Sequence, residues 1–143
     1  MASAAIAVAP IAVFHGIDDH CPQQEWLDMI SEGIDYAAPV ECIEIGTGRL
    51  TSIFERIEWQ VLTACHHLHN NPIFANKQIN IVGISQGGLI SRGIVERCEG
   101  LNVHTLFTWG GPHQGVSSYE KCQHWYCYPL NRVLGYFAEY LLL

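Results

Sequence analysis

The sequence predicts an α/β fold, in which helices cover the faces of a parallel sheet. Two observations favour this class. Short apolar, β-branched segments alternate along the chain with longer amphipathic segments, which is typical of strands alternating with helices. In addition, residues 79–84 (I-N-I-V-G-I) are almost continuously apolar, as a strand buried on both faces should be. We expect a single domain over residues 1–143.

The expected strands are short, and each runs into a turn that contains glycine. The first is an apolar run that ends just before His15. The second (V-E-C-I-E-I) alternates and is rich in β-branched residues. The four strands are expected at residues 11–14, 40–45, 79–84 and 103–109.

Apolar residues at helical spacing lie between and after these strands. Trp26, Ile30 and Ile34 recur every four residues, which predicts a helix there. A second apolar stripe, with charged residues on its other side, consists of Ile53, Phe54, Ile57, Val61, Leu62 and Leu68. The helices are expected at residues 25–36, 53–68, 87–98 and 130–143.

The composition is that of a globular protein and excludes two classes of interaction. Of the 143 residues, 49% are hydrophobic and 15% are charged. Only seven residues are Lys or Arg and the formal net charge is −7, which argues against nucleic-acid binding, because phosphate contacts need clustered basic side chains. No apolar run approaches the roughly 18 residues of a membrane span, so no transmembrane segment is expected.

The cysteine content favours an oxidising compartment. Six cysteines are an even and high number for this length, which indicates disulfides; reduced, buried thiols are the alternative. The apolar N-terminus resembles a secretory signal but lacks its basic n-region. Because residues 11–14 are needed as a strand, we expect this segment to be retained, with no clear signal peptide in the chain.

Residues 83–87 read G-I-S-Q-G, which matches the pattern G-x-S-x-G. The pentapeptide alone is a weak signal, but here a buried strand precedes it and an amphipathic helix follows it. That context is typical of a nucleophile elbow, where a tight turn exposes a serine Oγ at the sheet edge. Gly83 and Gly87 would keep side chains out of this turn. We therefore predict Ser85 as a nucleophile; the alternative is an ordinary turn with a capping serine.

A serine that attacks an acyl group needs an oxyanion hole, and two backbone N–H groups are expected to form it. One belongs to Gln86, at a helix N-terminus whose dipole favours negative charge. The other comes from the loop after an early strand, where His15, Gly16 and Ile17 follow in sequence. We predict Ile17 and Gln86 as the oxyanion donors and regard His15 as a turn histidine held by backbone hydrogen bonds.

Five segments in a fixed order carry a family resemblance. They are V-F-H-G-I-D-D at residues 13–19, I-E-I-G at 43–46, V-G-I-S-Q-G-G at 82–88, R-C at 97–98 and G-G-P-H-Q-G-V at 110–116. Together they resemble the palmitoyl-protein thioesterases, a lysosomal branch of the α/β-hydrolases. The resemblance implies an α/β-hydrolase-like parallel sheet with flanking helices, of which this chain carries the N-terminal half. It also implies the predicted roles of Ser85, Ile17 and Gln86.

The resemblance further implies disulfides and a location. It places Cys65 and Cys98 where the family joins two helices, and Cys122 and Cys127 where it has a small loop. Cys21 also matches a cysteine of the family but Cys42 has no counterpart, so this last pairing stays open. The expected bridges are Cys65–Cys98, Cys122–Cys127 and, left open, Cys21–Cys42. With the cysteine content, the family implies a lysosomal or secreted protein.

Two departures from the family pattern concern the site. Asp18 replaces a glycine beside the oxyanion loop, and we expect its carboxylate to point to water. The triad acid and histidine of the family lie far downstream, beyond a segment that helps form the acyl groove, so we expect the C-terminal part of the fold to be missing from these residues. The general base is not identified, because neither His113 nor His124 lies where the triad histidine is expected.

The implied reaction is hydrolysis of S-acyl (palmitoyl) cysteine thioesters in acylated proteins or peptides. Ser85 Oγ would attack the acyl carbonyl, and neither a metal nor an organic cofactor is needed. The C-H-H-L-H run at residues 65–69 is more typical of a solvated helix end than of a metal site. Two alternatives remain: a catalytically inactive, truncated form that binds acyl chains or proteins, and a general serine esterase or lipase.

Overall fold

The fold is described from a computed structural model, which describes residues 8–115. The chain divides into two compact units, residues 1–111 and 112–143, and most of the second unit lies outside the described residues. The expected helix at residues 130–143 and the expected Cys122–Cys127 bridge therefore lie outside the described part. The expectation of a single domain stays a prediction.

The first unit contains a parallel sheet in the strand order β2-β1-β3-β4. The two central strands, β1 and β3, pair in parallel. Their pairing runs from Ile11 opposite Asn80 to Phe14 opposite Gly83. This confirms the predicted α/β class. The strands are β1 (Ile11–Phe14), β2 (Val40–Cys42), β3 (Gln78–Ile84) and β4 (Asn102–Trp109).

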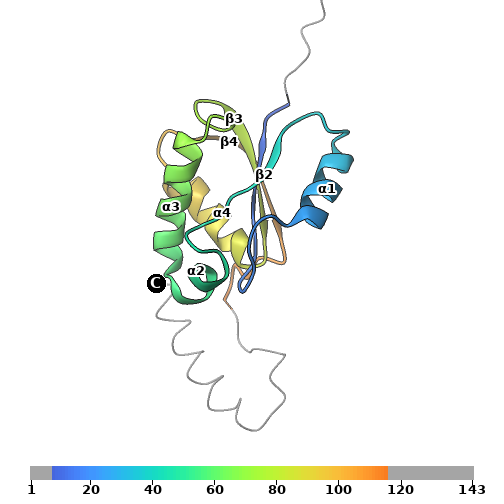
Figure 1. The fold of residues 1–143 in the computed structure, drawn as a ribbon. Coiled ribbons are helices and arrows are strands. Elements are labelled where there is room, and N and C mark those ends of the chain that lie inside the picture. Colours follow the sequence, from blue (N-terminus) through green and yellow to red (C-terminus); the bar gives the residue numbers. More distant parts are fainter. Residues whose placement is uncertain (1–7, 116–143) are drawn as a thin grey trace, which may run out of the picture. The chain divides into compact units, whose positions relative to one another are not determined.

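Helices cover both faces of the sheet (Figure 1). One face carries α1, and its Trp26 meets Trp109 at the end of β4 edge to face, with the ring centroids 5.4 Å apart. The opposite face carries α3 and α4, which pack on each other, and α4 also packs on β1, β3 and β4. The helices are α1 (Gln24–Gly33), α2 (Arg49–Phe54), α3 (Ile57–Asn70) and α4 (Gln86–Arg97).

The hydrophobic core lies between the sheet and the α3–α4 layer. Every second residue of β3 points into it, which is the two-residue period of a strand. By contrast, β4 is an edge strand of the described sheet, and most of its residues are exposed. The buried core cluster consists of Ala12, Phe14, Ile43, Ile45, Val61, Ala64, Leu68, Phe74, Ile79, Ile81, Ile90 and Ile94.

The expected strand at residues 40–45 is shorter in the structure and ends at Cys42. Its partner β1 has only four residues, and the ladder between them ends where Val13 pairs with Cys42. Ile43 and Ile45 are nevertheless buried in the core cluster. The alternating pattern thus predicted correctly that Ile43 and Ile45 are buried. It could not show that the neighbouring strand β1 has only four residues, which limits the length of β2.

The apolar stripe at residues 53–68 does not form one continuous helix face. The chain leaves the helix at Glu55, which is extended, and α3 begins at Ile57. Gln60 Nε2 donates to the Glu55 carbonyl oxygen at 2.9 Å, so a buried amide satisfies the end of α2. Because the break interrupts the helical period, Phe54 is exposed rather than buried. Leu62 is exposed because it lies beside, and not on, the face of α3 that buries Val61 and Leu68.

Two disulfides fasten these elements together. Cys21, in the loop after β1, is bonded to Cys42 at the end of β2, and Cys65 of α3 is bonded to Cys98 at the end of α4. Both pairings are among those considered from the sequence. In the described part of the chain no helix has the length and apolar character to cross a membrane.

Candidate active site

The site residues gather where the strand order reverses. From β1 the chain passes through α1 to β2 on one side, whereas from β3 it passes through α4 to β4 on the other side. The loops that follow β1 and β3 therefore diverge at the carboxyl ends of two adjacent strands, which is where ligands bind in open α/β sheets. Phe14 pairs with Gly83, so His15, the first residue after β1, lies beside Ile84, the last residue of β3.

Ser85 lies in a tight turn between β3 and α4. Its backbone has φ +53° and ψ −120°, a conformation that residues other than glycine rarely adopt. The Ser85 N–H donates to the Trp109 carbonyl oxygen at 2.8 Å, and the Gly88 N–H donates to the Ser85 carbonyl oxygen at 2.9 Å. These bonds hold the strained residue, whose side chain is exposed at the sheet edge.

The two glycines of the G-x-S-x-G pattern are required by close backbone contacts. A Cβ on Gly83 would overlap the Gly87 carbonyl group and lie 2.5 Å from Ser91 Oγ. A Cβ on Gly87 would overlap the Phe14 carbonyl group and lie 2.6 Å from the His15 carbonyl oxygen. Both positions lie where β3, α4 and the end of β1 meet, so any side chain would force these elements apart.

The loop after β1 lies against the serine. A Cβ on Gly16 would lie 3.2 Å from Ser85 Cβ, which is a tight contact, and 3.6 Å from Ser85 Oγ. Ile17 follows directly, and its side chain is exposed. On the other side, Gln86 is the first residue of α4, where backbone N–H groups lack partners within the helix. The structure thus brings Gly16, the residue before Ile17, close to Ser85, and Gln86 follows Ser85 directly.

His15 is held by two acceptors. It is 7% exposed; Nδ1 donates to the Gly16 carbonyl oxygen at 2.8 Å, and Nε2 lies 2.9 Å from Glu44 Oε1. The Glu44 carboxylate also accepts from the Cys21 N–H at 2.7 Å and from the Ile45 N–H at 3.1 Å. Glu44 therefore ties the loop after β1 to the chain after β2, and His15 has a structural role in this loop.

No role was predicted for Glu44, because its contacts with His15 and Cys21 join residues that are far apart in sequence. His15, Cys21 and Glu44 each bring a potential metal-ligand atom within 4.8 Å of the others. In this structure Cys21 Sγ is bonded to Cys42, so it is not a thiolate ligand. The three groups form a hydrogen-bonded support for the loop.

The carboxylate of Asp18 is exposed to solvent, in agreement with the expectation. Its side chain is 64% exposed and lies 3.3 Å from Arg49 Nε, at the start of α2. An exposed, paired carboxylate has little effect on the charge that develops at an oxyanion, because water screens it. Asp18 itself has φ +59°, and its N–H donates to Ser52 Oγ at 2.9 Å.

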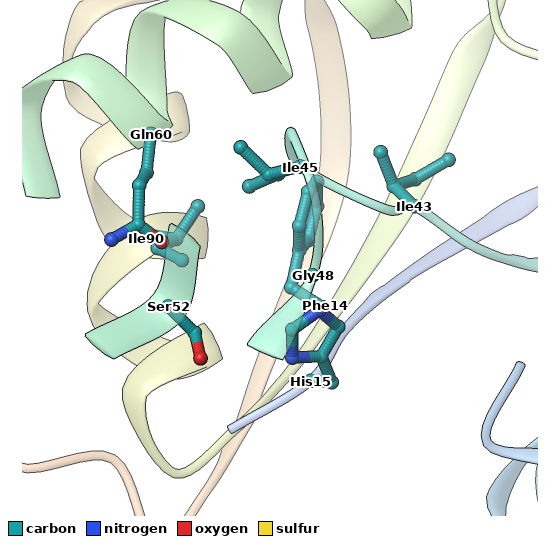
Figure 2. Close-up of a pocket in the computed structure, with 8 residues that line it drawn as sticks. All are labelled: Phe14, His15, Ile43, Ile45, Gly48, Ser52, Gln60 and Ile90. Atoms are coloured by element: carbon teal, nitrogen blue, oxygen red, sulfur yellow. The ribbon is translucent and has the colours of Figure 1, made fainter. Parts of the chain in front are cut away.

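A cavity of about 10 Å³ lies beneath these loops, between the end of β1 and the helices α2, α3 and α4 (Figure 2). It has room for about one water molecule and none for an acyl chain. Acyl binding would therefore need a different surface. The cavity is lined by Phe14, His15, Ile43, Ile45, Gly48, Ser52, Gln60 and Ile90.

His104 is too far from Ser85 to act as its general base. It lies on β4 between Val103 and Thr105, which pair with Ile79 and Asn80 of β3. Ser85 follows five residues after Asn80, which is about 16 Å along a strand. His113 belongs to the second unit, and His124 lies outside the described residues.

The chain matches a known family along nearly its whole length. The family model described as "Palmitoyl protein thioesterase" matches residues 10–140. Palmitoyl-protein thioesterase 3 of Dictyostelium discoideum is 30% identical over 112 residues, which are 76% of this chain and 37% of that protein. Palmitoyl-protein thioesterase 1 of Caenorhabditis elegans is 26% identical over 120 residues, which are 79% of this chain and 40% of that protein.

Solved structures share the fold at low sequence identity. Aspergillus fumigatus lipase B has a TM-score of 0.61 and 13% identity, with 76% of this chain and 25% of that chain covered. A lipase-esterase related protein from Clostridium acetobutylicum ATCC 824 has a TM-score of 0.53 and 16% identity, with 80% and 45% covered. These similarities show an α/β-hydrolase fold. With the match of the family model, they show that this chain belongs to the palmitoyl protein thioesterase family.

Proposed function

We propose that this protein hydrolyses S-acyl cysteine thioesters and that Ser85 is the nucleophile. The observation that carries the proposal is the strained turn at Ser85, against which the glycine backbone of the loop after β1 is packed. It supports the proposal because the exposed Ser85 lies between the loop that carries Ile17 and the start of α4, which carries Gln86. An acyl carbonyl attacked there would develop its negative charge next to these two predicted donors.

The proposed reaction has two halves. Ser85 Oγ gives up its proton to a general base and attacks the acyl carbonyl carbon, and the oxyanion accepts hydrogen bonds from the Ile17 and Gln86 N–H groups. Collapse of this intermediate breaks the C–S bond and releases the cysteine thiolate, which takes up the proton. Water then attacks the carbonyl carbon of the acyl-serine, the bond between that carbon and Ser85 Oγ breaks, Oγ takes up a proton from the water, and the fatty acid leaves. Each oxyanion donor is expected to contribute about 10²–10³-fold to the rate.

The proposal of a thioester substrate rests on the similarity to palmitoyl-protein thioesterases. The chain spans 37–40% of the length of the two palmitoyl-protein thioesterases described above, so the activity of a whole protein is part of the proposal. We propose that residues 1–143 belong to a single α/β-hydrolase domain whose base, triad acid and acyl groove come from outside the described residues. The small cavity beneath the loops is consistent with this division.

We also propose that the protein works in an oxidising compartment, either lysosomal or extracellular. The support is that every cysteine among the described residues is in a disulfide. One bridge joins the loop after β1 to β2, next to the candidate site, so the oxidised state also supports the loop that carries Ile17.

A matched pair of substrates tests the proposed function. The protein and its Ser85→Ala variant are each given an S-palmitoyl cysteine peptide and the O-palmitoyl serine peptide of the same sequence, and free fatty acid is measured. We expect faster release from the thioester and none above background with Ser85→Ala. Equal release from both peptides would favour a general esterase. No release by well-folded protein would favour the catalytically inactive form that binds acyl chains or proteins, and would contradict the proposal.

A further inference from the structure

Ser52 contacts both segments that carry the proposed oxyanion donors. It lies on the six-residue helix α2 and is 3% exposed. Figure 2 shows it on α2, at the wall of the cavity beneath the two loops. A residue in this position can act on the loop after β1 and on the start of α4 at once.

The hydroxyl of Ser52 holds the loop after β1. Ser52 Oγ donates to the Arg49 carbonyl oxygen at 2.8 Å, which leaves its lone pairs to accept the Asp18 N–H at 2.9 Å. Asp18 has the left-handed φ of +59°, which in a non-glycine residue needs support from its surroundings. Because Asp18 directly follows Ile17, this hydrogen bond fixes the peptide plane next to the Ile17 donor.

The backbone carbonyl of Ser52 holds the other segment. Gln86 Nε2 donates to the Ser52 carbonyl oxygen at 2.8 Å. A carbonyl oxygen can only accept, so this contact fixes which end of the Gln86 amide faces α2. Gln86 begins α4 and directly follows Ser85. One residue of α2 is therefore connected, through two different groups, to both donor segments.

We propose that Ser52 is the positioning residue of the oxyanion hole, which sets the placement of the Ile17 and Gln86 N–H groups relative to each other. The inference rests on the proposed function and deepens it. Ser52 does not touch the reacting atoms; it acts through the two segments that it holds. Loss of its hydroxyl releases the first segment and leaves the contact between its carbonyl and Gln86 in place.

Three variants separate this role from a general effect on folding. Ser52→Ala removes the hydroxyl, and Ser52→Thr keeps it as the conservative rescue. Thr51→Ala is the matched control, because Thr51 is the neighbouring buried hydroxyl on α2 and its Oγ1 accepts from the Thr47 N–H at 2.9 Å. The thermal unfolding of each variant reports its loss of stability independently.

Two measurements are made on each variant. Phosphonylation of Ser85 by a fluorophosphonate is resolved into a binding constant and a maximal rate, and exchange of the Asp18 amide proton is followed by NMR. For Ser52→Ala we expect the maximal rate to fall about tenfold, less than the 10²–10³-fold loss of a whole donor, with the binding constant unchanged. Its Asp18 amide exchanges faster. Thr51→Ala should leave both readouts unchanged, and Ser52→Thr should restore them.

An unchanged maximal rate in Ser52→Ala, or a decrease that Thr51→Ala reproduces, would overturn the inference. If the unsubstituted protein is not labelled at all, the proposed function fails and the positioning role with it. The Asp18 exchange distinguishes the causes, because it reports the contact between Ser52 and the loop without any reaction. Unchanged Asp18 exchange in Ser52→Ala would show that Ser52 does not hold the loop.

Discussion

Gly16 lies against Ser85 so closely that a Cβ on Gly16 would lie 3.2 Å from Ser85 Cβ. These residues are 69 positions apart in sequence, and they meet because β1 and β3 are adjacent parallel strands that end together. The contact between Gly16 and Ser85 therefore follows from the strand order of the sheet. The serine, its turn and the loop beside it form one packed unit, and most of the expected outcomes below follow from that packing.

Gly87→Ala should destabilise the fold strongly. Its Cβ would overlap backbone at the end of β1, which cannot move without separating α4 from the sheet. We expect a loss of about 3 kcal/mol or more in the free energy of unfolding, at the upper end of what overpacking costs. Denaturant-induced unfolding measures it.

Gly33→Ala is the matched control for Gly87→Ala. Gly33 is the last residue of α1, and a Cβ there has nothing within 4 Å. Alanine should stabilise the helix by about 0.5–1 kcal/mol. Equal effects of the two substitutions would contradict the packing described at Gly87.

Ser85→Gly should be more stable than Ser85→Ala. The positive φ of Ser85 strains any residue with a Cβ, and glycine relieves that strain. We expect Ser85→Gly to exceed Ser85→Ala by roughly 1 kcal/mol in the free energy of unfolding, because such conformations cost about 1–3 kcal/mol. Both variants lack the hydroxyl, so thermal or denaturant unfolding isolates the backbone effect. An alanine variant as stable as the glycine variant would show that the turn is not strained.

Removing the Cys65–Cys98 bridge should destabilise the α3–α4 layer. The two cysteines are 33 residues apart, and a loop of this length restricts the unfolded chain substantially. On the chain-entropy estimate, a double Cys→Ala variant should lose about 3–4 kcal/mol. Unfolding without reductant measures this loss. Reductant breaks the bridge in the unsubstituted protein too, so the difference in the free energy of unfolding should then disappear. A difference that persists would point to lost packing instead.

Glu96 on α4 should titrate below the usual range of a glutamate. The hydrogen bond from Arg92 Nε, 2.7 Å from Glu96 Oε1, is the main cause that lowers the pKa of Glu96. Because the folded-state pKa is lowered, the pair favours the fold above the unfolded-state pKa, and this contribution is lost as the pH falls through the folded-state pKa. Arg92→Ala should raise the pKa of Glu96, as measured by NMR titration of its carboxyl carbon.

Arg56→Ala is the control for the Glu96 titration, because Arg56 pairs with Glu58 on a different helix. It should leave the titration of Glu96 unchanged. The overall stability should hardly respond to Arg92→Ala, since exposed ion pairs contribute little. An unchanged pKa of Glu96 in Arg92→Ala would show that this contact is absent in solution.

The sequence predicted the elements around the serine well, because each had a strong local signal. A continuously apolar strand and two glycines flanking Ser85 were visible as a pattern, and the structure explains both glycines by backbone contact. The prediction of one helix over residues 53–68 was wrong, because a period counted along the chain assumes an unbroken helix. The break at Glu55 depends on a buried amide from the next helix, which no local pattern reveals.

The supporting residues of the site could not be predicted from the sequence. Glu44 and Ser52 act through contacts with residues 29 and 34 positions away, which only the strand order brings together. Ser52 in particular has no motif around it that indicates a role. Local patterns thus predicted the candidate nucleophile, whereas the residues that hold its surroundings became visible only in the fold.

The most direct test of the central claim is covalent labelling of Ser85. The folded protein and its Ser85→Ala variant are treated with a fluorophosphonate, and the adduct is located by mass spectrometry of the intact protein and its peptides. We expect a single adduct on the peptide that contains Ser85, no adduct on Ser85→Ala, and none on denatured protein. An adduct that persists in Ser85→Ala, or folded protein that takes no label, would contradict the assignment of Ser85 as the nucleophile.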